Sequence, residues 1–459
     1  MNQDRSLKVL ILAGGMGKRL WPLSRKRWPK YMLRLGMEKS LIQQAYERIN
    51  ADKKDRYIVS SREAGFLIEK EISSADVYFV KENLISEPAS RNTAPAIMLG
   101  INNFKDDDIV VVLPADHIIE GDFEETIYRA KEIALEGYIV TIGIKPRTPA
   151  TGYGYIRKSE ENILEGWKVE SFREKPNLET AKKYVESGEY FWNAGIFVFK
   201  VSVMREEMKK YAPKIYESFE EIREGSSLDE VYRNMKGISI DYAVMEKTKK
   251  AAVVAFDGKW DDLGSWESVF NILTSKNGSY KSKNSLLIDS KNTMLYSEGG
   301  KLLAGVGLED IILVDTDDAI LVLKKGQGQK VQEVVEELED SPLITYHSWD
   351  SRPWGGYRVL ESSPGYKVKI LEVSPGKRLS LQSHKKRDEV WTVMSGKCRA
   401  TLGEETRDLR AGDTVKIPAG LIHRAENTGQ TVLKILELAS GDEIDEEDIV
   451  RYEDDYKRC

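Results

Sequence analysis

The most constraining feature of the chain is a short apolar run that leads directly into a glycine-rich loop. Residues 7–13 read LKVLILA, and a run this rich in Val, Leu and Ile is typical of a strand buried on both faces of a parallel sheet. The loop that follows contains Gly14, Gly15 and Gly17. Without Cβ atoms, its backbone N–H groups can approach a polyphosphate, and Arg19 and Lys30 can add positive charge. The glycine spacing fits neither a Walker A loop nor a G-x-G-x-x-G dinucleotide fingerprint. The alternative is a tight turn that carries solvated basic residues.

Apolar strand candidates and amphipathic helix candidates alternate along the first 145 residues. The strand candidates are 56–61, 77–81, 108–116 and 138–145, and the helix candidates are 40–49, 65–72, 94–104 and 123–137. This alternation predicts crossover units and a doubly wound α/β domain with a mixed, mostly parallel sheet. Ligands of such sheets bind at the carboxyl ends of the strands, so the polar residues that follow the strands are the candidate site residues.

The bulk composition narrows the class of function. The 459 residues predict two or three domains, and the formal net charge of −6 argues against a general nucleic-acid binder. The two cysteines, Cys398 and Cys459, indicate neither a disulfide framework nor a cysteine zinc site. The sequence has no apolar signal region and no run of about 18 apolar residues, so we expect a cytoplasmic protein that does not span a membrane.

Three polar segments lie where a ligand of such a sheet would bind. They are EPASRNTAP at 87–95 with Arg91 and Asn92, LPADH at 113–117 with Asp116, and WDDLGSW at 260–266 with Asp262. From residue type alone, each segment could equally be a helix cap or a solvated turn.

The string LAGGMGKRLWPLSRKRWPK at 12–30 resembles the signature of the sugar-1-phosphate nucleotidyltransferases, and its LWPLSR portion resembles their mannose-1-phosphate guanylyltransferase branch. The three segments above resemble the same family. The resemblance implies that the glycine loop wraps a nucleoside triphosphate, with Arg19 on the phosphates and Lys30 near the reacting centre. It also implies that Arg91 and Asn92 lie by the nucleotide, and that Asp116 and Asp262, not Asp261, hold Mg²⁺. Met16, Lys18 and Tyr31 stand where the family usually has Ser, Thr and Gln, and none of them removes an essential charge.

Residues 150–200 carry side chains suited to a sugar phosphate, because carboxylates and amides pair with hydroxyl groups and a cation pairs with phosphate. By resemblance, Glu174 and Asn193 hold mannose hydroxyls and Lys175 holds the sugar phosphate. Gly152 and Gly195 would let the backbone approach the sugar. Without the resemblance, each polar residue would be interpreted as a surface residue.

The pattern changes between residues 280 and 340, where short β-rich runs follow one another without long helices. By resemblance this region is a small stack of parallel strands, similar to a β-helix, and the run 331–340 predicts a helix. We expect a scaffold role for it. A break at Ser341-Pro342 predicts the start of the next domain.

The last 119 residues are β-rich and carry a second group of candidate ligands, Gln382, His384, Glu389 and His423. Their spacing among Gly376, Gly396, Gly412 and Asn427 resembles the two-part cupin pattern, with Gln382 in place of the usual first histidine. Residues 382 and 384 share one face of a strand, so the four side chains can converge on one divalent metal. Such a mixed N/O site suits Zn²⁺, Co²⁺, Fe²⁺ or Mn²⁺. The alternative is a buried histidine pair in a jelly-roll core.

Further segments, such as RPWGGY at 352–357 and DIVRY at 448–452, resemble the type II phosphomannose isomerase domain. The resemblance implies an important, catalytic Arg387 inside the metal motif. One departure stands out: Val390 replaces a histidine that follows the metal-binding glutamate in the family. Adjacent strand residues point to opposite faces, so we expect Val390 to face away from the metal.

Together the resemblances imply a bifunctional enzyme with a transferase domain (1–279), a β-helix-like segment with a linker helix (280–340) and a cupin domain (341–459). The first domain would convert GTP and mannose-1-phosphate to GDP-mannose and pyrophosphate. The cupin would interconvert mannose-6-phosphate and fructose-6-phosphate. The alternatives are a transferase whose cupin is only structural or dimerising, a non-catalytic sugar-nucleotide sensor, and an enzyme for another nucleotide or sugar. A homodimer is plausible from the family.

Overall fold

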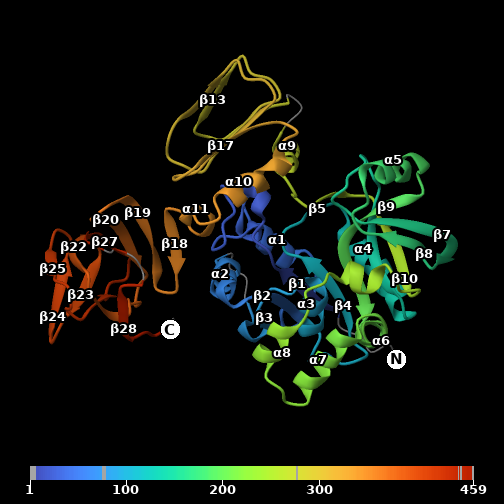
Figure 1. The fold of residues 1–459 in the computed structure, drawn as a ribbon, viewed down its shortest axis with the longest axis horizontal. Coiled ribbons are helices and arrows are strands. Elements are labelled where there is room, and N and C mark those ends of the chain that lie inside the picture. The colour runs from blue at the N-terminus through green and yellow to red at the C-terminus, as the bar shows by residue number, and fades with distance from the viewer. Residues whose placement is uncertain (1–6, 75–78, 275–277, 443, 445–446, 457–459) are drawn as a thin grey trace. The chain divides into compact units, whose positions relative to one another are not determined.

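The computed structural model describes residues 7–74, 79–274, 278–442, 444 and 447–456 (Figure 1). The chain forms two compact units, one of residues 1–316 with 320–340 and one of residues 317–319 with 341–459. No helix in the described ranges combines the length and the apolar character that a membrane crossing requires.

The first unit is built on a nine-stranded sheet with the order β3-β2-β1-β4-β9-β6-β10-β8-β7. Its strands are β1 (Leu7–Ala13), β2 (Arg56–Ser61), β3 (Leu84–Glu87), β4 (Ile109–Pro114), β6 (Ile139–Ile144), β7 (Tyr155–Ile163), β8 (Gly166–Arg173), β9 (Tyr190–Lys200) and β10 (Ala251–Phe256). Strand β1 pairs in parallel with β2 and β4, whereas β9 runs antiparallel to β4 and β6. This mixed, doubly wound α/β sheet confirms the expected fold class.

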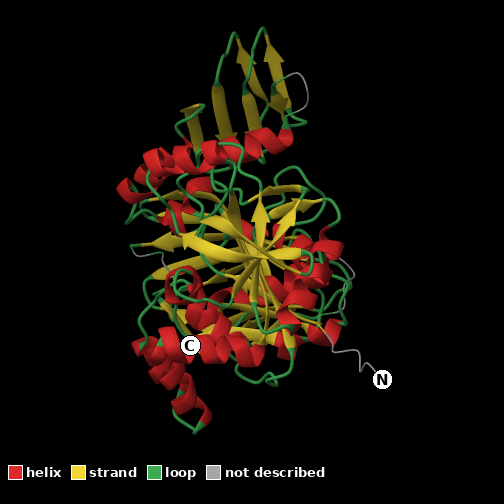
Figure 2. Cartoon of the chain, turned by 90° about the vertical axis from the view of Figure 1, so that its right-hand side faces the viewer, coloured by secondary structure: helices red, strands yellow, loops and turns green. Residues whose placement is uncertain are grey.

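Helices cover both faces of this sheet (Figure 2). They are α1 (Leu41–Glu47), α2 (Arg62–Ser73), α3 (Thr93–Gly100), α4 (Phe123–Leu135), α5 (Leu178–Ser187), α6 (Val201–Tyr211), α7 (Pro213–Arg223) and α8 (Leu228–Asn234). A further helix, α9 (Trp266–Leu273), precedes the small sheets described below. Val9 and Ile11 of β1 pack in one core cluster with α1, α2 and α4, and Leu10 packs in the other with α3, α6 and α7. The apolar run 7–13 is therefore buried on both faces, as its composition predicts.

The expected strand at 77–81 is not the edge strand of this sheet. Residues 77 and 78 lie outside the described residues, Lys81 begins a 3₁₀ turn, and the edge strand is β3, Leu84–Glu87. Phe79 packs against the core from an irregular segment, so its apolar character reflects burial and not strand pairing.

The region after α9 forms two small sheets, with the orders β12-β14-β16-β17 and β13-β15. The strands are β12 (Tyr280–Lys281), β13 (Ser285–Ile288), β14 (Met294–Ser297), β15 (Leu303–Val306), β16 (Ile311–Asp315) and β17 (Ile320–Lys324). Pairing is parallel except between β16 and β17, which matches the expected stack of parallel strands. A 3₁₀ turn, η6 (Gly328–Lys330), then leads into helix α10 (Val331–Glu337).

The second unit begins with the short helix α11 (Pro342–Thr345) and continues as two antiparallel sheets with the orders β18-β19-β20-β27-β22-β25 and β24-β23-β26-β21-β28. The strands are β18 (Trp349–Arg352), β19 (Gly355–Ser363), β20 (Tyr366–Val373), β21 (Leu381–His384), β22 (Arg387–Ser395), β23 (Lys397–Leu402), β24 (Glu405–Arg410), β25 (Thr414–Ile417), β26 (His423–Asn427), β27 (Leu433–Gly441) and β28 (Ile449–Glu453). Apolar side chains from both sheets, among them Val373, Trp391 and Ala425, share one core. This confirms the all-β domain that the resemblance to the cupin pattern implies.

Candidate functional site

The loop after β1 needs glycine for two different reasons. Gly15 and Gly17 have φ angles of 83° and 75°, in the left-handed region that side chains disfavour. In addition, a Cβ atom on Gly17 would lie 2.5 Å from the Cβ atom of Lys30. The Lys30 amide also donates to the Met16 carbonyl, at 3.1 Å. The loop and the lysine segment are therefore packed against each other as one piece.

Lys30 joins the two predicted metal-binding loops. Its Nζ atom donates to the Asp116 Oδ2 atom at 2.7 Å, and also to the backbone carbonyl of Asp262. The two loops are tied together by a small antiparallel ladder between β5 (Ile118–Glu120) and β11 (Lys259–Asp261). Asp116 and Asp262 are 86 and 232 positions from Lys30 in the sequence, yet both contact it. They meet at the end of β4, where the sheet topology places ligands.

The two neighbouring aspartates of the second loop have different surroundings. The Asp262 Oδ1 atom accepts hydrogen bonds from the Tyr153 hydroxyl and the Gly264 amide, both at 2.9 Å. Asp261 instead accepts the Leu263 amide at 2.7 Å, which closes its own turn. Asp262 is therefore the aspartate that the fold turns toward Tyr153, whereas Asp261 serves the loop.

Charge is balanced within this cluster. Burial would raise the pKa of Asp116, but the positive charge of Lys30 and its hydrogen bond outweigh burial and lower it. Burial lowers the pKa of His117 to about 4, so this ring is neutral at pH 7. It packs edge-on against Trp260, with 5.4 Å between ring centroids. The result is an anionic carboxylate at neutral pH beside one lysine ammonium.

A cavity of about 620 Å³ opens beside the cluster. Of the predicted site residues, it is lined by Gly14, Gly15, Arg91, Asn92, Asp116 and Gly195. Asn92 also caps α3, where its Oδ1 atom accepts the Thr93 amide at 2.8 Å. The Arg91 guanidinium donates to the backbone carbonyls of Tyr232, at 3.4 Å, and of Arg233. In this structure both residues thus also support the loop that carries them.

The predicted sugar-binding residues lie around Asn193, which is 8% exposed. Its Oδ1 atom accepts the Thr141 hydroxyl at 2.7 Å and the Gly195 amide at 3.0 Å, and its Nδ2 atom donates to the Asp241 Oδ1 atom at 3.0 Å. One N–H of the amide is left for a ligand. Asn193 therefore both holds the turn at Gly195 (φ 68°) and faces a carboxylate.

Two carboxylates, those of Glu174 and Asp241, lie in this region. Burial and the charge of Asp241 raise the pKa of Glu174 to about 7, although Lys175 opposes the shift from 3.3 Å. Burial also raises the pKa of Asp241. Gly152 is exposed, and a Cβ atom added to it would have no heavy-atom neighbour within 4 Å, so the structure gives this position open space. The neighbouring Gly154 is the glycine that packs against Glu174, because a Cβ atom there would lie 2.6 Å from the Glu174 Oε2 atom.

Sequence reasoning missed Asp241. Asp241 begins a π-helical turn, Asp241–Met245, and lines the 620 Å³ cavity. Such turns recur at functional sites, but their i→i+5 hydrogen bonds leave no periodic signal in a sequence. Glu246, which accepts the Glu174 amide at 2.9 Å, comes from the same segment.

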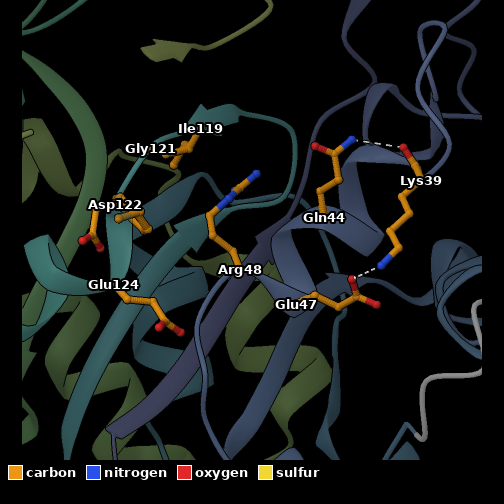
Figure 3. Close-up of a pocket in the computed structure, with 9 residues that line it drawn as sticks. Lys39, Gln44, Glu47, Arg48, Ile119, Gly121, Asp122 and Glu124 are labelled. Carbon is orange, nitrogen blue, oxygen red and sulfur yellow. Dashed lines mark hydrogen bonds and ion pairs between the residues drawn. The ribbon is translucent and has the colours of Figure 1, made fainter. Parts of the chain in front are cut away.

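A separate cavity of about 460 Å³ lies beside α1 and contains none of the predicted site residues (Figure 3). Figure 3 shows Arg48 between Gln44 and Glu47 of α1 and the segment with Asp122 and Glu124. Arg48 donates to the His117 carbonyl at 2.8 Å and so buttresses the Asp116 loop from behind. The other polar groups pair with one another: Lys39 with Glu47, and Gln44 with the Lys39 carbonyl.

The second unit brings together His384 from β21, Glu389 from β22 and His423 from β26. One nitrogen or oxygen atom from each of the three lies within 4.8 Å of the other two, and all three residues are buried. The His384 Nε2 atom lies 3.1 Å from Glu389 Oε1, and the His423 Nε2 atom lies 3.6 Å from Glu389 Oε2. Gln382 stands next to His384, with 3.4 Å between Gln382 Nε2 and His384 Nε2, and opposite His423 on the neighbouring strand.

The chemistry of this trio fits a divalent metal. The His423 Nδ1 atom lies 2.9 Å from the Leu421 carbonyl, which holds the proton on Nδ1 and leaves the Nε2 lone pair directed at Glu389. That Nε2 atom is buried without a hydrogen-bond partner among the described residues. Two imidazoles, one carboxylate and the nearby Gln382 amide form a donor set suited to a transition metal.

Arg387 and Trp391 support the trio on the same strand. Arg387 Nε donates to Glu389 Oε1 at 3.1 Å, and Trp391 Nε1 donates to Glu389 Oε2 at 3.2 Å. Burial would raise the pKa of Glu389, but its hydrogen bond with His384 and the charges of the two histidines and Arg387 lower it. The Glu389 carboxylate is therefore ionised at neutral pH. Arg387 also lines a cavity of about 590 Å³ with the neighbouring Lys385 and Lys386.

Comparisons with known proteins assign a family to each part of the chain. Residues 8–277 match the family described as nucleotidyl transferase, residues 283–338 match the MannoseP isomerase/GMP-like beta-helix domain, and residues 339–454 match the mannose-6-phosphate isomerase C-terminal family. Mannose-1-phosphate guanylyltransferase 2 of Escherichia coli O157:H7 is 38% identical, over 99% of both chains. This chain belongs to the mannose-1-phosphate guanylyltransferase family.

Further relatives extend the same conclusion. The alginate biosynthesis protein AlgA of Pseudomonas aeruginosa is 37% identical, over 98% of this chain and 97% of its own. A crystal structure from Thermus thermophilus, described as a mannose-1-phosphate geranyltransferase, is 32% identical with a TM-score of 0.66, over 73% of this chain and 99% of its own. As a member of this family, the chain combines a nucleotidyltransferase unit with an isomerase-type C-terminal domain.

Val390 lies on the outer side of its strand, β22. Arg387, Glu389, Trp391 and Val393 alternate as buried residues along β22, and Val390 between them is only half-buried. The period of two therefore turns Val390 away from the trio, as expected from its position next to Glu389.

A further buried pair in the second unit was missed by sequence reasoning. Glu437 of β27 pairs in register with both Trp391 and Lys369, and its Oε1 atom lies 3.5 Å from the Lys369 Nζ atom. Burial and the charge of Glu389 raise the pKa of Glu437. The only sequence signal is a charged residue among apolar ones in the run LKILELA.

Proposed function

We propose that the first unit catalyses nucleotidyl transfer from GTP to mannose-1-phosphate, which yields GDP-mannose and pyrophosphate. The observation that carries this proposal is Lys30, whose ammonium bonds the Asp116 carboxylate and the Asp262 carbonyl directly behind the glycine-rich loop. Family membership supports the same activity. The cavity beside this cluster has room for a nucleotide, with Arg91 and Asn92 on its wall.

In this reaction an oxygen of the sugar phosphate attacks the α-phosphorus of GTP in line. The new P–O bond forms as the bond to the β-phosphate oxygen breaks, and the electron pair leaves with pyrophosphate. Lys30 and Arg19 would stabilise the charge that develops on the phosphate oxygens. Asp116 and Asp262 would hold Mg²⁺, which offsets phosphate charge when bound. Glu174 and Asn193 would orient the sugar hydroxyls, and Lys175 its phosphate.

The neighbouring aspartates provide a matched test. Asp262→Asn should lower the rate of pyrophosphate release by about 10²–10³-fold, as expected for the loss of a group that stabilises transition-state charge. Asp261→Asn, the control, should retain most of the activity because the Asp261 carboxylate accepts the Leu263 amide of its own turn and is not the one that bonds Tyr153. Equal loss in both variants would contradict the assignment of Asp262. Equal rates with ATP and GTP would contradict the preference for guanine.

We propose further that the second unit interconverts mannose-6-phosphate and fructose-6-phosphate with a metal held by Gln382, His384, Glu389 and His423. The buried trio supports this proposal, as does the match to the isomerase C-terminal family. A metal there would polarise the substrate oxygens. Arg387 would stabilise negative charge on the substrate. The rival proposal is that the cupin binds a structural metal and has no isomerase activity. The replacement of the family's histidine by Val390 motivates it.

The two proposals differ in a direct assay. Metal-stripped protein should form fructose-6-phosphate from mannose-6-phosphate only after Co²⁺ or Zn²⁺ is added, and His384→Ala should lose this activity. His347→Ala is a suitable control, since His347 stacks on Trp349 at 5.1 Å and takes no part in the trio. Protein that makes GDP-mannose but shows no isomerisation with any metal would favour the structural role.

A further inference from the structure

A long-range hydrogen bond joins the turn after the β-helix strands to the glycine-rich loop. Arg19 donates from Nη1 to the Gln329 Oε1 atom at 2.9 Å, and the two residues are 310 positions apart. Within the described chain this is the only hydrogen bond of Arg19. Helix α10, next to Gln329, packs against the 3₁₀ turn Lys18–Leu20 that carries Arg19. In Figure 1, α10 lies along the blue N-terminal region.

The loop that carries Gln329 is anchored by a second contact. Glu267 accepts the amides of Gly326 and Gly328 on one oxygen, at 2.9 and 2.7 Å. A Cβ atom on Gly328 would lie 2.0 Å from the Glu267 Oε2 atom, so only glycine permits this approach. Glu267 belongs to the first turn of α9, five residues after Asp262. The loop is therefore fastened to the same element that follows the second predicted metal ligand.

The hydrogen bond from Arg19 to Gln329 leaves the positive charge of Arg19 intact. A glutamine carbonyl accepts one guanidinium N–H but does not neutralise the cation, and four of the five N–H donors stay available. An unrestrained arginine side chain loses considerable rotamer freedom when it binds a ligand. If the side chain is already held in place before the ligand binds, part of this entropic cost of binding is removed.

We propose that Gln329 is a positioning residue of the transferase site: it holds the Arg19 guanidinium beside the glycine-rich loop, ready for the phosphates of the nucleoside triphosphate. The segment 326–330 is then part of the catalytic apparatus and not only the scaffold expected from its sequence. This inference rests on the proposed transferase function, in which Arg19 contacts phosphate.

The test measures phosphate binding separately from turnover, by titration calorimetry with GTP and with inorganic tripolyphosphate, both with Mg²⁺. Gln329→Ala should raise the dissociation constant of both probes about threefold to tenfold, the range for the net loss of one typical hydrogen bond. Gln329→Glu keeps the acceptor but forms an ion pair with Arg19, and should weaken binding more, most clearly at low salt. Gln332→Ala, which removes an exposed glutamine bonded to Glu336 on α10, should bind like the wild type.

A double-mutant cycle separates positioning from a general structural effect. In an Arg19→Ala background, Gln329→Ala should leave the dissociation constants unchanged, because the residue acts only through Arg19. The KM for mannose-1-phosphate should stay the same in Gln329→Ala while the KM for GTP rises. Wild-type affinity in Gln329→Ala, or a full further loss in the Arg19→Ala background, would overturn the inference. A wild-type chain that makes no nucleotide sugar would refute the proposed function instead. The tripolyphosphate data would still show whether Gln329 positions Arg19 for phosphate binding.

Discussion

Replacing Lys30 by methionine tests the charge balance at the centre of the first unit. The substitution keeps the length and apolar stem of the side chain but removes the ammonium that bonds Asp116 Oδ2 at 2.7 Å and the Asp262 carbonyl. The side chain of Lys30 is 8% exposed and that of Asp116 is 28% exposed, so the carboxylate keeps some contact with water. His117 Nε2 lies 3.8 Å from Asp116, but this ring is neutral at pH 7 and cannot replace the lysine charge.

The expected loss of stability follows from these contacts. Breaking a fully buried ion pair costs about 3–5 kcal/mol, and the partial exposure of Asp116 reduces this to about 2–3 kcal/mol. For a unit of this size the corresponding fall in Tm is about 3 °C. The pKa of Asp116 should rise in the variant, because burial is then opposed only weakly. Wild-type Asp116 has a lowered pKa, so its contribution is present at neutral pH and is lost as the pH falls through that value. The deficit of the variant should therefore be largest near pH 7 and vanish in acid.

The measurement is urea or thermal unfolding of both proteins at pH 7 and at pH values well below 3.8, the ordinary pKa of an aspartate, with EDTA and with Mg²⁺. A cation bound at Asp116 would replace part of the missing charge, so Mg²⁺ should reduce the deficit without restoring turnover. Lys26→Met, at an exposed lysine of the same loop, is the control and should unfold like the wild type. A Lys30→Met protein as stable as the wild type at pH 7 in EDTA would refute this reasoning.

Three further predictions concern single groups. Glu174 has a pKa raised to about 7 from an ordinary value of 4.5, so the stability it contributes is complete below pH 4.5 and is lost as the pH rises through about 7; Glu174→Gln should flatten the dependence of unfolding free energy on pH between 5 and 8, and an unchanged slope would contradict the shift. Glu389→Gln should lower the metal content of purified protein at least tenfold, measured by elemental analysis, because an ionised ligand is lost from the trio; full metal occupancy in this variant would exclude Glu389 as a ligand. Val390→His should leave the metal content unchanged and any isomerase rate within about twofold, because position 390 lies on the outer side of β22; a rate increase well beyond this would assign a proton-transfer role to that histidine.

Much of the molecule was predictable because local patterns coincide with the fold. The run 7–13 is buried on both faces, as an uninterrupted apolar strand must be in the middle of a sheet. The period of two, which is readable from sequence, places His384 and Glu389 on the buried faces of their strands. The packing of the sheet that carries His384 and His423 against the sheet that carries Glu389 then brings the three side chains together. Family resemblance supplied what these patterns lack, namely the particular substrates.

The tertiary structure alone decided which distant residues meet. No local pattern connects Arg19 with Gln329, Asn193 with Asp241, or Glu437 with Lys369, because each contact joins segments tens to hundreds of residues apart. The same holds for the different surroundings of Asp261 and Asp262, which depend on the β5–β11 ladder and on Tyr153. The sequence by itself determined the elements and the chemical groups they carry. The packing of those elements determined which groups face one another, because burial and hydrogen bonding act between parts of the chain that only the folded state brings into contact.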